Sequence, residues 1–342
     1  MINSHPIDLR SDTVTTPDQH MRAVMAGAAV GDDVLDRDPT MRALEERVAG
    51  LLGCEDALWT PSGSMGNLIA LMLHLKRGDR FLAPAFSHVL GSELGTAAWL
   101  AGGMPEALPH DAGPGRPSAA TVRKAAGDAG PYYALRTTLL CLENTHNFAG
   151  GAVTPPEEHV QLVSAAKDLG LLVHLDGARV WNAAVSLGVP PGVLTVGVDS
   201  VQVCLSKGLG APVGSVLAST SVRIAEARRF RKMLGGGVRQ GGMLAAAGML
   251  ALDRMADLAQ DHANAVTLAD GLRERGWTVD VPQTNIVLAD APDPAVTVAH
   301  LDSLGVRALP LAGRVRFTTH RDVSAADITD ALQRASAFAP HC

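Results

Sequence analysis

The sequence predicts an α/β protein built on a mainly parallel sheet with helices on both faces. The first observation is an alternation: between about residues 55 and 220, short apolar segments typical of strands are separated by amphipathic segments with helical spacing. The second is size, because 342 residues are enough for two domains of ~150 residues each. Hydrophobic residues make up 47% of the chain, which supplies a core and excludes disorder as the main state.

The elements of the first domain follow from these patterns. The helix over 39–52 has the clearest ends: Asp38 is the candidate N-cap, Pro39 occupies the first helical position, and Gly53 follows the last turn. Residues 111–118, rich in Gly and Pro, are typical of a surface loop. The full set of expected strands is 57–60, 80–83, 137–142, 171–176, 199–205 and 213–218, and the expected helices are 39–52, 64–76, 156–169 and 221–234.

A smaller C-terminal α/β domain is expected after this region. We place the division between a large domain, 1–245, and a small one, 246–342. Apolar positions recur along 239–275, which indicates one long helix or two abutting helices. The elements expected beyond it are strands at 285–289 and 315–319 and helices near 294–304 and 324–338.

The composition excludes several classes of function. There are 29 Lys and Arg against 35 Asp and Glu, and aromatic residues make up only 4%, so no nucleic-acid partner is expected. The longest uncharged runs are broken by Pro, Gly or polar residues, so no membrane span is expected. The cysteines show no CxxC spacing, which predicts no metal site, no disulfide framework and a cytoplasmic protein with free thiols. They are Cys54, Cys141, Cys204 and Cys342.

Two neighbouring strand ends carry charged residues. The apolar strand LLVHLD ends in Asp176, with Arg179 close behind, and the next strand leads to Ser206 and Lys207 and then a Gly-rich loop. Ligands of parallel α/β sheets bind at the carboxyl ends of strands. A lysine there can form a Schiff base, and a carboxylate beside it can keep a pyridine nitrogen protonated, which favours pyridoxal 5'-phosphate (PLP) as the cofactor. Each residue alone also has a structural interpretation, as a solvated loop lysine or a helix-capping aspartate.

An anion site for the cofactor phosphate is expected at TPSGSMGN, residues 60–67. This segment follows a strand and opens a helix, so the backbone N–H groups of Gly63 and Ser64 would be free to bind an anion. Such turns are common, and the motif alone is weak. Neither GxxxxGK[ST] nor a GxGxxG after the first strand is present, which disfavours a nucleotide site. His174 lies on the same face of its strand as Asp176, and we expect it to bond that carboxylate rather than to act in catalysis.

Taken together, the motifs resemble those of the L-threonine aldolases, PLP enzymes of fold-type I, the aspartate-aminotransferase-like fold. The resemblance implies a three-layer large domain, a smaller C-terminal α/β domain, and a homodimer or homotetramer. The matching blocks run in order from residue 7 to about 330: IDLRSDTVTTP (7–17), VGDDV (30–34), DPT (38–40), PSGSMGN (61–67), SH (87–88), ENTHN (143–147), HLDGAR (174–179), CLSKGLGAPVGS (204–215), RKMLGGGVRQ (231–240), LAAAG (244–248) and VRFTTH (315–320).

The resemblance implies cofactor contacts for seven residues: Gly63, Ser64, His88, Asp176, Arg179, Ser206 and Lys207. Lys207 would bind PLP covalently, with Ser206 beside it. Asp176 would pair with the pyridine nitrogen. Gly63 and Ser64 would hold the phosphate.

The resemblance also implies roles around the substrate. His88 would stack on the cofactor ring and, with Glu93, move a proton. Arg179 would contact the cofactor's phenolic oxygen and share in substrate binding. Arg316 would anchor the substrate carboxylate, with Ser11 close by.

Two positions depart from the family pattern. Leu35 stands where many members have tyrosine, and Tyr133 stands where many have histidine, three residues before Arg136. Both positions are expected near the substituent on the substrate's β-carbon, so selectivity there is left open. Lys232 or Arg239 is expected to reach the cofactor phosphate of a neighbouring subunit.

The implied activity is a reversible carbon–carbon lyase reaction. The enzyme would cleave L-threonine, L-allo-threonine and related β-hydroxy-α-amino acids to glycine and an aldehyde. One alternative is a β-eliminating lyase or an aminotransferase on the same scaffold. Another is a catalytically inactive binding protein.

Overall fold

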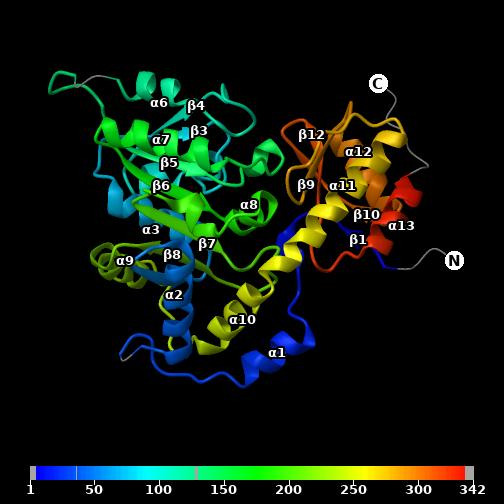
Figure 1. Ribbon diagram of the computed structural model, residues 1–342, viewed down its shortest axis with the longest axis horizontal. Coiled ribbons are helices and arrows are strands. Elements are labelled where there is room, and N and C mark those ends of the chain that lie inside the picture. Colours follow the sequence, from blue (N-terminus) through cyan, green and yellow to red (C-terminus); the bar gives the residue numbers. More distant parts are fainter. Residues whose placement is uncertain (1–4, 36, 128–129, 336–342) are drawn as a thin grey trace.

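The computed structural model describes residues 5–35, 37–127 and 130–335, and a seven-stranded sheet lies at its centre (Figure 1). Among the described strands of this sheet, β8 runs opposite to all the others, which share one direction. The predicted α/β class with a mainly parallel sheet is confirmed. In spatial order the strands are β2 (Asp56–Thr60), β8 (Ser215–Ser219), β7 (Ser200–Cys204), β6 (Leu172–Gly177), β5 (Arg136–Glu143), β3 (Asp79–Pro84) and β4 (Met104–Leu108).

The edge strand β4 was not predicted from the sequence. Its residues, MPEAL, include a proline and a glutamate, and only Leu108 among them is buried. It lies beyond β3 at the end of the sheet. An edge strand has solvent in place of one neighbour, so it tolerates proline and needs no apolar pattern.

Helices cover both faces of the sheet (Figure 1). Leu58 of β2 packs with side chains of α3 (Gly63–His74) and α9 (Ser221–Met233). The next residue, Trp59, belongs to a different apolar cluster on the opposite face, because successive strand residues point to opposite faces. The helices of that second face are α2 (Pro39–Leu52), α6 (Ala119–Ala126), α7 (Pro156–Asp168) and α8 (Val180–Leu187).

The ends of α2 are those expected from its sequence. The Asp38 side chain accepts hydrogen bonds from the backbone N–H groups of Thr40 and Met41, at 3.0 and 2.9 Å. Gly53 closes the helix with φ of 67°, a left-handed conformation that glycine adopts without strain. The α2 prediction is therefore confirmed at both ends.

The small domain contains a three-stranded antiparallel sheet, seen on the right of Figure 1. The region 239–275 forms two helices, α10 (Gly242–Asp253) and α11 (Leu258–Glu274), separated by a short turn of helix. No helix among the described residues is long and apolar enough to cross a bilayer. The remaining elements are β9 (Ile286–Asp290), α12 (Pro294–Ser303), β11 (Leu309–Leu311), β12 (Arg314–Thr318) and α13 (Ala325–Ala335). Residues 336–338 of the expected last helix lie outside the described residues.

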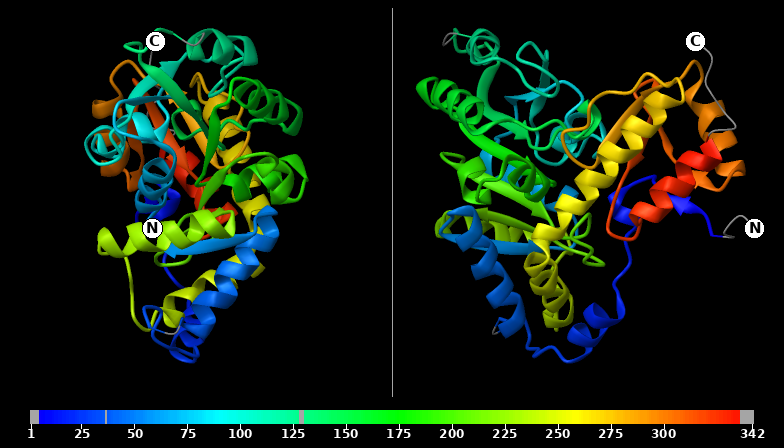
Figure 2. Two further views of the ribbon diagram at one scale, coloured as in Figure 1. Left: turned by 90° about the vertical axis from the view of Figure 1, so that its left-hand side faces the viewer. Right: turned by 45° about the vertical axis from the view of Figure 1, so that its right-hand side comes forward.

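The N-terminal segment joins the two domains. Helix α1 (Gln19–Ala26) packs against α10, whose apolar side chains extend past the predicted division at residue 245 but belong to the core of the large domain. Strand β1 (Ile7–Asp8) instead pairs in parallel with β10 (Val306–Arg307) of the small domain. Figure 2 shows this segment, in blue, crossing between them. Ile7 and Leu9 share an apolar cluster with the C-terminal elements. The division at residue 245 stays a prediction, and this packing argues for grouping Ile7 and Leu9 with the small domain.

Candidate active site

A cavity of about 370 Å³ opens where the parallel strands end. Strands β2 and β7 run in the same direction because both are antiparallel to β8. The carboxyl ends of β2, β3, β5, β6 and β7 therefore lie at one edge of the sheet. The predicted site residues that line the cavity are Ser11, Gly63, Ser64, His88, Glu93, Asp176, Arg179, Ser206, Lys207 and Arg316.

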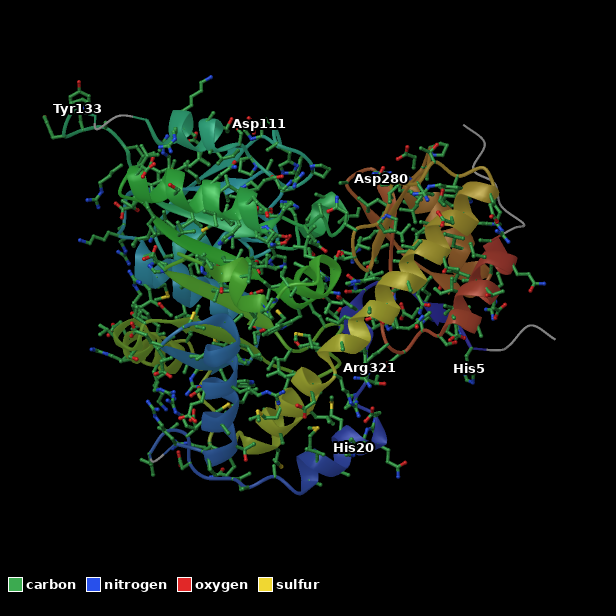
Figure 3. The ribbon with its side chains drawn as sticks, viewed as in Figure 1. His5, His20, Asp111, Tyr133, Asp280 and Arg321 are labelled. Carbon is green, nitrogen blue, oxygen red and sulfur yellow. The ribbon has the colours of Figure 1, made fainter. Side chains whose placement is uncertain are left out.

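Two predicted substrate contacts, Leu35 and Tyr133, do not line this cavity. Their exposed fractions are 76% and 78%, and Figure 3 shows Tyr133 at the outer edge of the large domain. A single chain therefore does not bring them to the other site residues. Their role near the β-carbon stays a prediction, and it requires a second subunit.

The cavity wall holds two carboxyl groups that are joined by one amide. Asn67, on α3, donates from Nδ2 to Asp176 Oδ2 at 2.8 Å and to Glu93 Oε1 at 2.9 Å. The Glu93 Oε1 atom also lies 2.8 Å from Nδ1 of His88, the first residue of α4 (His88–Gly91). Asp176 Oδ1 accepts a further hydrogen bond from the backbone N–H of Ala178. These contacts fix the orientation of the Asp176 carboxyl group toward the cavity.

His88 and Glu93 share a hydrogen bond that affects the pKa of both groups. Burial lowers the pKa of His88, but the hydrogen bond with Glu93 and the charge of Asp176 outweigh it and raise that pKa above its ordinary value. Burial raises the pKa of Glu93, and Asp176 adds to this rise, while the hydrogen bonds with His88 and Asn67 oppose it. The pair therefore retains a proton to higher pH than an isolated imidazole, which suits proton transfer near neutral pH.

Arg179 is held by an aspartate that the sequence analysis did not single out. The Nε and Nη2 atoms of Arg179 each lie 2.7 Å from an oxygen of Asp12, and both side chains are almost fully buried. Burial raises the pKa of Asp12, but the charge and hydrogen bonds of Arg179 outweigh this effect. The pKa of Asp12 therefore lies well below its ordinary value. This bidentate ion pair ties the N-terminal segment to the end of β6.

Arg316, on β12, brings a second buried guanidinium group to the cavity. Its Nη1 donates to Asn147 Oδ1 at 3.0 Å, its Nη2 donates to the Arg10 carbonyl at 2.9 Å, and its buried Nε has no partner among the described residues. Burial, followed by repulsion from Arg179, lowers the pKa of Arg316 to about 10, so it remains charged at neutral pH. A buried cation whose direct partners are neutral oxygens is suited to an anionic ligand.

Lys207 follows β7 and lies half-buried in the cavity wall. Its backbone carbonyl accepts a hydrogen bond of 3.1 Å from Thr15 Oγ1. This contact fixes the loop from the side of the N-terminal segment. The Lys207 side chain is therefore presented at the same sheet edge as Asp176.

The start of α3 has the features of an anion site. The first N–H groups of a helix have no partner within it, and here they belong to Gly63 and Ser64, which line the cavity. A Cβ atom on Gly63 would lie 2.9 Å from both Cys204 Sγ and Gln202 Nε2. Glycine therefore keeps this wall open, and the helix terminus can approach an anion closely.

These residues fit PLP. The cavity offers an amine at Lys207, a carboxylate at Asp176 on a neighbouring strand, and the first backbone N–H groups of α3, at Gly63 and Ser64. The His88 ring lines the same space. A lysine, a pyridine partner, a phosphate site and a planar ring are the groups that this cofactor requires.

Several cavity residues were missed by the sequence analysis. Asn67 lies within an apolar helix, and nothing in its local sequence marks it as the link between two carboxyl groups. His174 was expected to bond Asp176, but its Nε2 lies 3.1 Å from Asn67 Oδ1. Asn147 bonds both buried arginines, and its motif, ENTHN, was the only signal.

One ligand atom from each of His88, Glu93 and Asp176 lies within 4.8 Å of the other two. We assign this convergence to the hydrogen bonds among these side chains, because Asn67 already donates to both carboxyl groups. The expectation that the chain holds no metal stays a prediction.

Comparison with known proteins agrees with this geometry. The beta-eliminating lyase family matches residues 8–293. A probable low-specificity L-threonine aldolase 2 of Arabidopsis thaliana is 41% identical over 333 residues, which cover 94% of each chain. The low specificity L-threonine aldolase of Escherichia coli K12 is 40% identical over 337 residues, covering 97% of this chain and 99% of that one. The solved structure of a Leishmania major threonine aldolase superimposes with a TM-score of 0.82, at 20% identity, over 96% of this chain and 98% of that one.

The fold and the cavity define a fold-type I, PLP-dependent enzyme, as predicted. The chain belongs to the beta-eliminating lyase family, in the group that includes the low-specificity L-threonine aldolases. It is a lyase, which confirms that prediction. The predicted cofactor, PLP, fits the cavity, and a serine palmitoyltransferase of the same fold, 18% identical with a TM-score of 0.74, has been solved with PLP.

Proposed function

We propose that the protein is an aldolase that cleaves L-threonine, L-allo-threonine and related β-hydroxy-α-amino acids reversibly to glycine and an aldehyde. The observation that carries this proposal is the meeting of Lys207, Asp176 and Arg316 in one cavity. The names of the relatives support the substrate class. Bound PLP supplies a ring that accepts electrons from the substrate's Cα.

Arg316 is the proposed anchor for the substrate carboxylate. Its charge and its Nε, which has no partner among the described residues, support this role. Ser11 lines the same cavity. A bidentate grip on the carboxylate restricts rotation about the bond between nitrogen and Cα. The Cα–Cβ bond is then held in the orientation in which it breaks most easily.

His88 and Glu93 are the proposed groups that move the proton of the β-hydroxyl. Carbon–carbon cleavage requires that this hydroxyl lose its proton as the aldehyde forms. The imidazole is neutral above its raised pKa and accepts a proton directly or through one water. The hydrogen bond from His88 Nδ1 to Glu93 leaves Nε2 to face the substrate.

A second candidate is β-elimination, which the name of the matched family favours. In that reaction a group leaves from the β-carbon, and ammonia and a keto acid are the products. The two reactions differ in the atom that loses a proton, Cα in elimination and the β-hydroxyl oxygen in aldol cleavage. Their products therefore distinguish them.

A cytoplasmic homodimer or homotetramer completes the proposal. Leu94 lies just before α5 (Thr96–Trp99), and Trp99 is the last residue of that helix. Their exposed fractions are 94% and 68%, and such apolar surface near a cavity supports assembly. Lys232 and Arg239 are also exposed and lie outside the chain's own cavity, which supports their reach into a partner's site. A monomeric mass in light scattering would contradict the assembly.

The deciding experiment incubates the PLP-loaded enzyme with L-threonine and measures acetaldehyde, glycine, ammonia and keto acid. Acetaldehyde and glycine in equal amounts, with neither ammonia nor keto acid, are expected. The Lys207→Ala variant should lose the yellow absorbance of lysine-bound cofactor and at least ~10³-fold of the rate, because both covalent binding and proton transfer need this amine.

A matched control is Lys124→Ala, which removes an exposed lysine of α6 outside the cavity. It should retain the absorbance and the rate. Ammonia and keto acid as the main products would replace the aldolase proposal with β-elimination. Retained absorbance in Lys207→Ala would remove the assignment of Lys207.

A further inference from the structure

A buried chain of polar side chains runs from the cavity into the interior of the large domain. It consists of Asn67, His174, Ser200 and His74, which we call the polar chain. Asn67 Oδ1 lies 3.1 Å from His174 Nε2, His174 Nδ1 lies 2.8 Å from Ser200 Oγ, and Ser200 Oγ lies 2.7 Å from His74 Nε2. All four residues are at least nine-tenths buried.

The polar chain is held by three elements of the core. Asn67 and His74 lie on α3, His174 lies on β6, and Ser200 lies on β7. His174 and Ser200 are partners in the register of these parallel strands. The positions of the four side chains are therefore set by sheet and helix packing, not by a surface loop.

The direction of every hydrogen bond in the polar chain follows from its end in the cavity. The Asn67 amide donates both of its hydrogens, to Asp176 and to Glu93. Its oxygen must then accept, so His174 carries its proton on Nε2.

The same logic continues inward along the polar chain. The His174 Nδ1 atom then accepts a hydrogen bond from the Ser200 hydroxyl. The Ser200 oxygen accepts in turn from Nε2 of His74. Both imidazoles fit this pattern as neutral rings.

The surroundings of the two histidines agree with neutral rings. Burial lowers the pKa of His174 to about 4, against the opposing charge of Asp176. Burial also lowers the pKa of His74 to about 3, with His174 and then Arg223 lowering it further and Asp199 opposing them as smaller effects. The polar chain is therefore uncharged at neutral pH.

We propose that the polar chain is a set of positioning residues that locks the Asn67 amide with its N–H groups toward Asp176 and Glu93. The inference rests on the proposed role of Asp176 at the cofactor's pyridine nitrogen. Without the donor on His174, the amide is free to turn its oxygen toward the two carboxyl groups. Asp176 would then lose a hydrogen bond that stabilises its charged form. A proton shared with the cofactor would move toward the carboxyl oxygen and away from the pyridine nitrogen.

The first test measures the protonation of the pyridine nitrogen by NMR, with PLP labelled with ¹⁵N in the ring. His174→Leu removes the donor, and the pKa of the pyridine nitrogen should fall by about one unit, a tenfold change in its proton affinity. His174→Gln restores a donor to Asn67 and should recover most of this change.

The matched control for this test is His159→Leu. His159 is a buried histidine of α7 whose Nε2 lies 3.0 Å from the Val196 carbonyl, and it lies outside the polar chain. Its variant should leave the pyridine nitrogen protonated as in the wild type. A His174→Leu variant that does the same would overturn the proposal.

The second test uses the cofactor-free protein with ¹⁵N-labelled histidine. The wild type should show His174 as a neutral ring with its proton on Nε2. The Ser200 hydroxyl, by donating to Nδ1, adds to the effect of Asn67 on this tautomer, so Ser200→Ala should raise the fraction of His174 that carries its proton on Nδ1. Ser219→Ala is the control, because Ser219 is the register partner of Ser200 on β8 and its hydroxyl donates to the Asp199 carbonyl, away from the polar chain.

The two tests separate this inference from the proposed function. A wild-type His174 that is charged, or that carries its proton on Nδ1, would overturn the polar chain whether or not PLP binds. A protein that binds no PLP would overturn the proposed function, and the tautomer measurement would still decide the direction of the chain.

Discussion

Glu93 raises the pKa of His88, the proposed proton acceptor of the cavity. It is buried, and it accepts hydrogen bonds from both His88 and Asn67 through the same oxygen, Oε1. Its other oxygen, Oε2, is buried without a partner among the described residues. The carboxyl group therefore acts on the cavity mainly through the imidazole of His88.

Glu93→Gln should move the acidic limb of the pH profile of kcat/KM to lower pH. The glutamine has no charge, so the raised pKa of His88 falls toward the value that burial favours. The imidazole then becomes neutral, and active as a base, at lower pH. The measurement is the rate of aldehyde release across pH 5 to 9.

The acidic limb of the pH profile is assigned to His88, so His88→Asn should abolish it. An acidic limb at the same pH in the wild type and in Glu93→Gln would contradict the assignment of the pair.

At the scale of elements, α3 does the most to build the site. It begins at Gly63 directly after β2, because Ser62 caps it by accepting a hydrogen bond from the N–H of Met65. Its first turn lines the cavity, and Asn67 follows one turn later. Gly66 faces the sheet, where a Cβ atom would lie 2.6 Å from Gln202 Cγ.

Gly66→Ala should destabilise the protein by about 1–3 kcal/mol, as expected for overpacking in a core. Gln202 is fully buried and has little room to move. The intrinsic helix preference alone would favour alanine by about 1 kcal/mol. Gly50→Ala in α2 isolates that preference, because a Cβ there meets nothing within 4 Å.

Urea denaturation of both variants gives the comparison. Gly50→Ala should be unchanged or more stable than the wild type. Equal gains in both variants would show that Gln202 yields without cost.

Strand ends could be predicted from the sequence because β6 and β7 are mostly apolar segments with a charged residue at or shortly after their ends. Asp176 and Lys207 were found in this way. The Asp12–Arg179 pair could not be found, because its residues are far apart in the chain and each has many alternative partners. Asn67 was missed because its role depends on the register of α3 against the sheet, which local periodicity does not determine.

At the scale of the whole molecule, the two domains meet around buried charge. Asp261 of α11 is 3% exposed. Burial, and then repulsion by Asp12 of the N-terminal segment, raise its pKa to about 7, against the attraction of Arg321. Folding therefore favours the protonated form of Asp261, and its contribution to stability is lost as pH rises through about 7.

Asp261→Asn should be more stable than the wild type at pH 8, by about 2 kcal/mol, and the difference should shrink toward pH 5. The asparagine keeps the shape of the side chain without a proton to lose. Unfolding in urea at several pH values measures the difference. Asp270→Asn, at an exposed position of the same helix, should show no such trend, and a constant difference for Asp261→Asn would contradict the argument.

The pairing of β1 with β10 also imposes an order on how the protein is made. Ile7 leaves the ribosome well before its partner Val306. Strand β1 must therefore wait unpaired until β10 has been made, a state that favours misassembly. Because Ser11 and Asp12 follow that strand directly, the nascent chain cannot complete its cavity until the small domain has emerged.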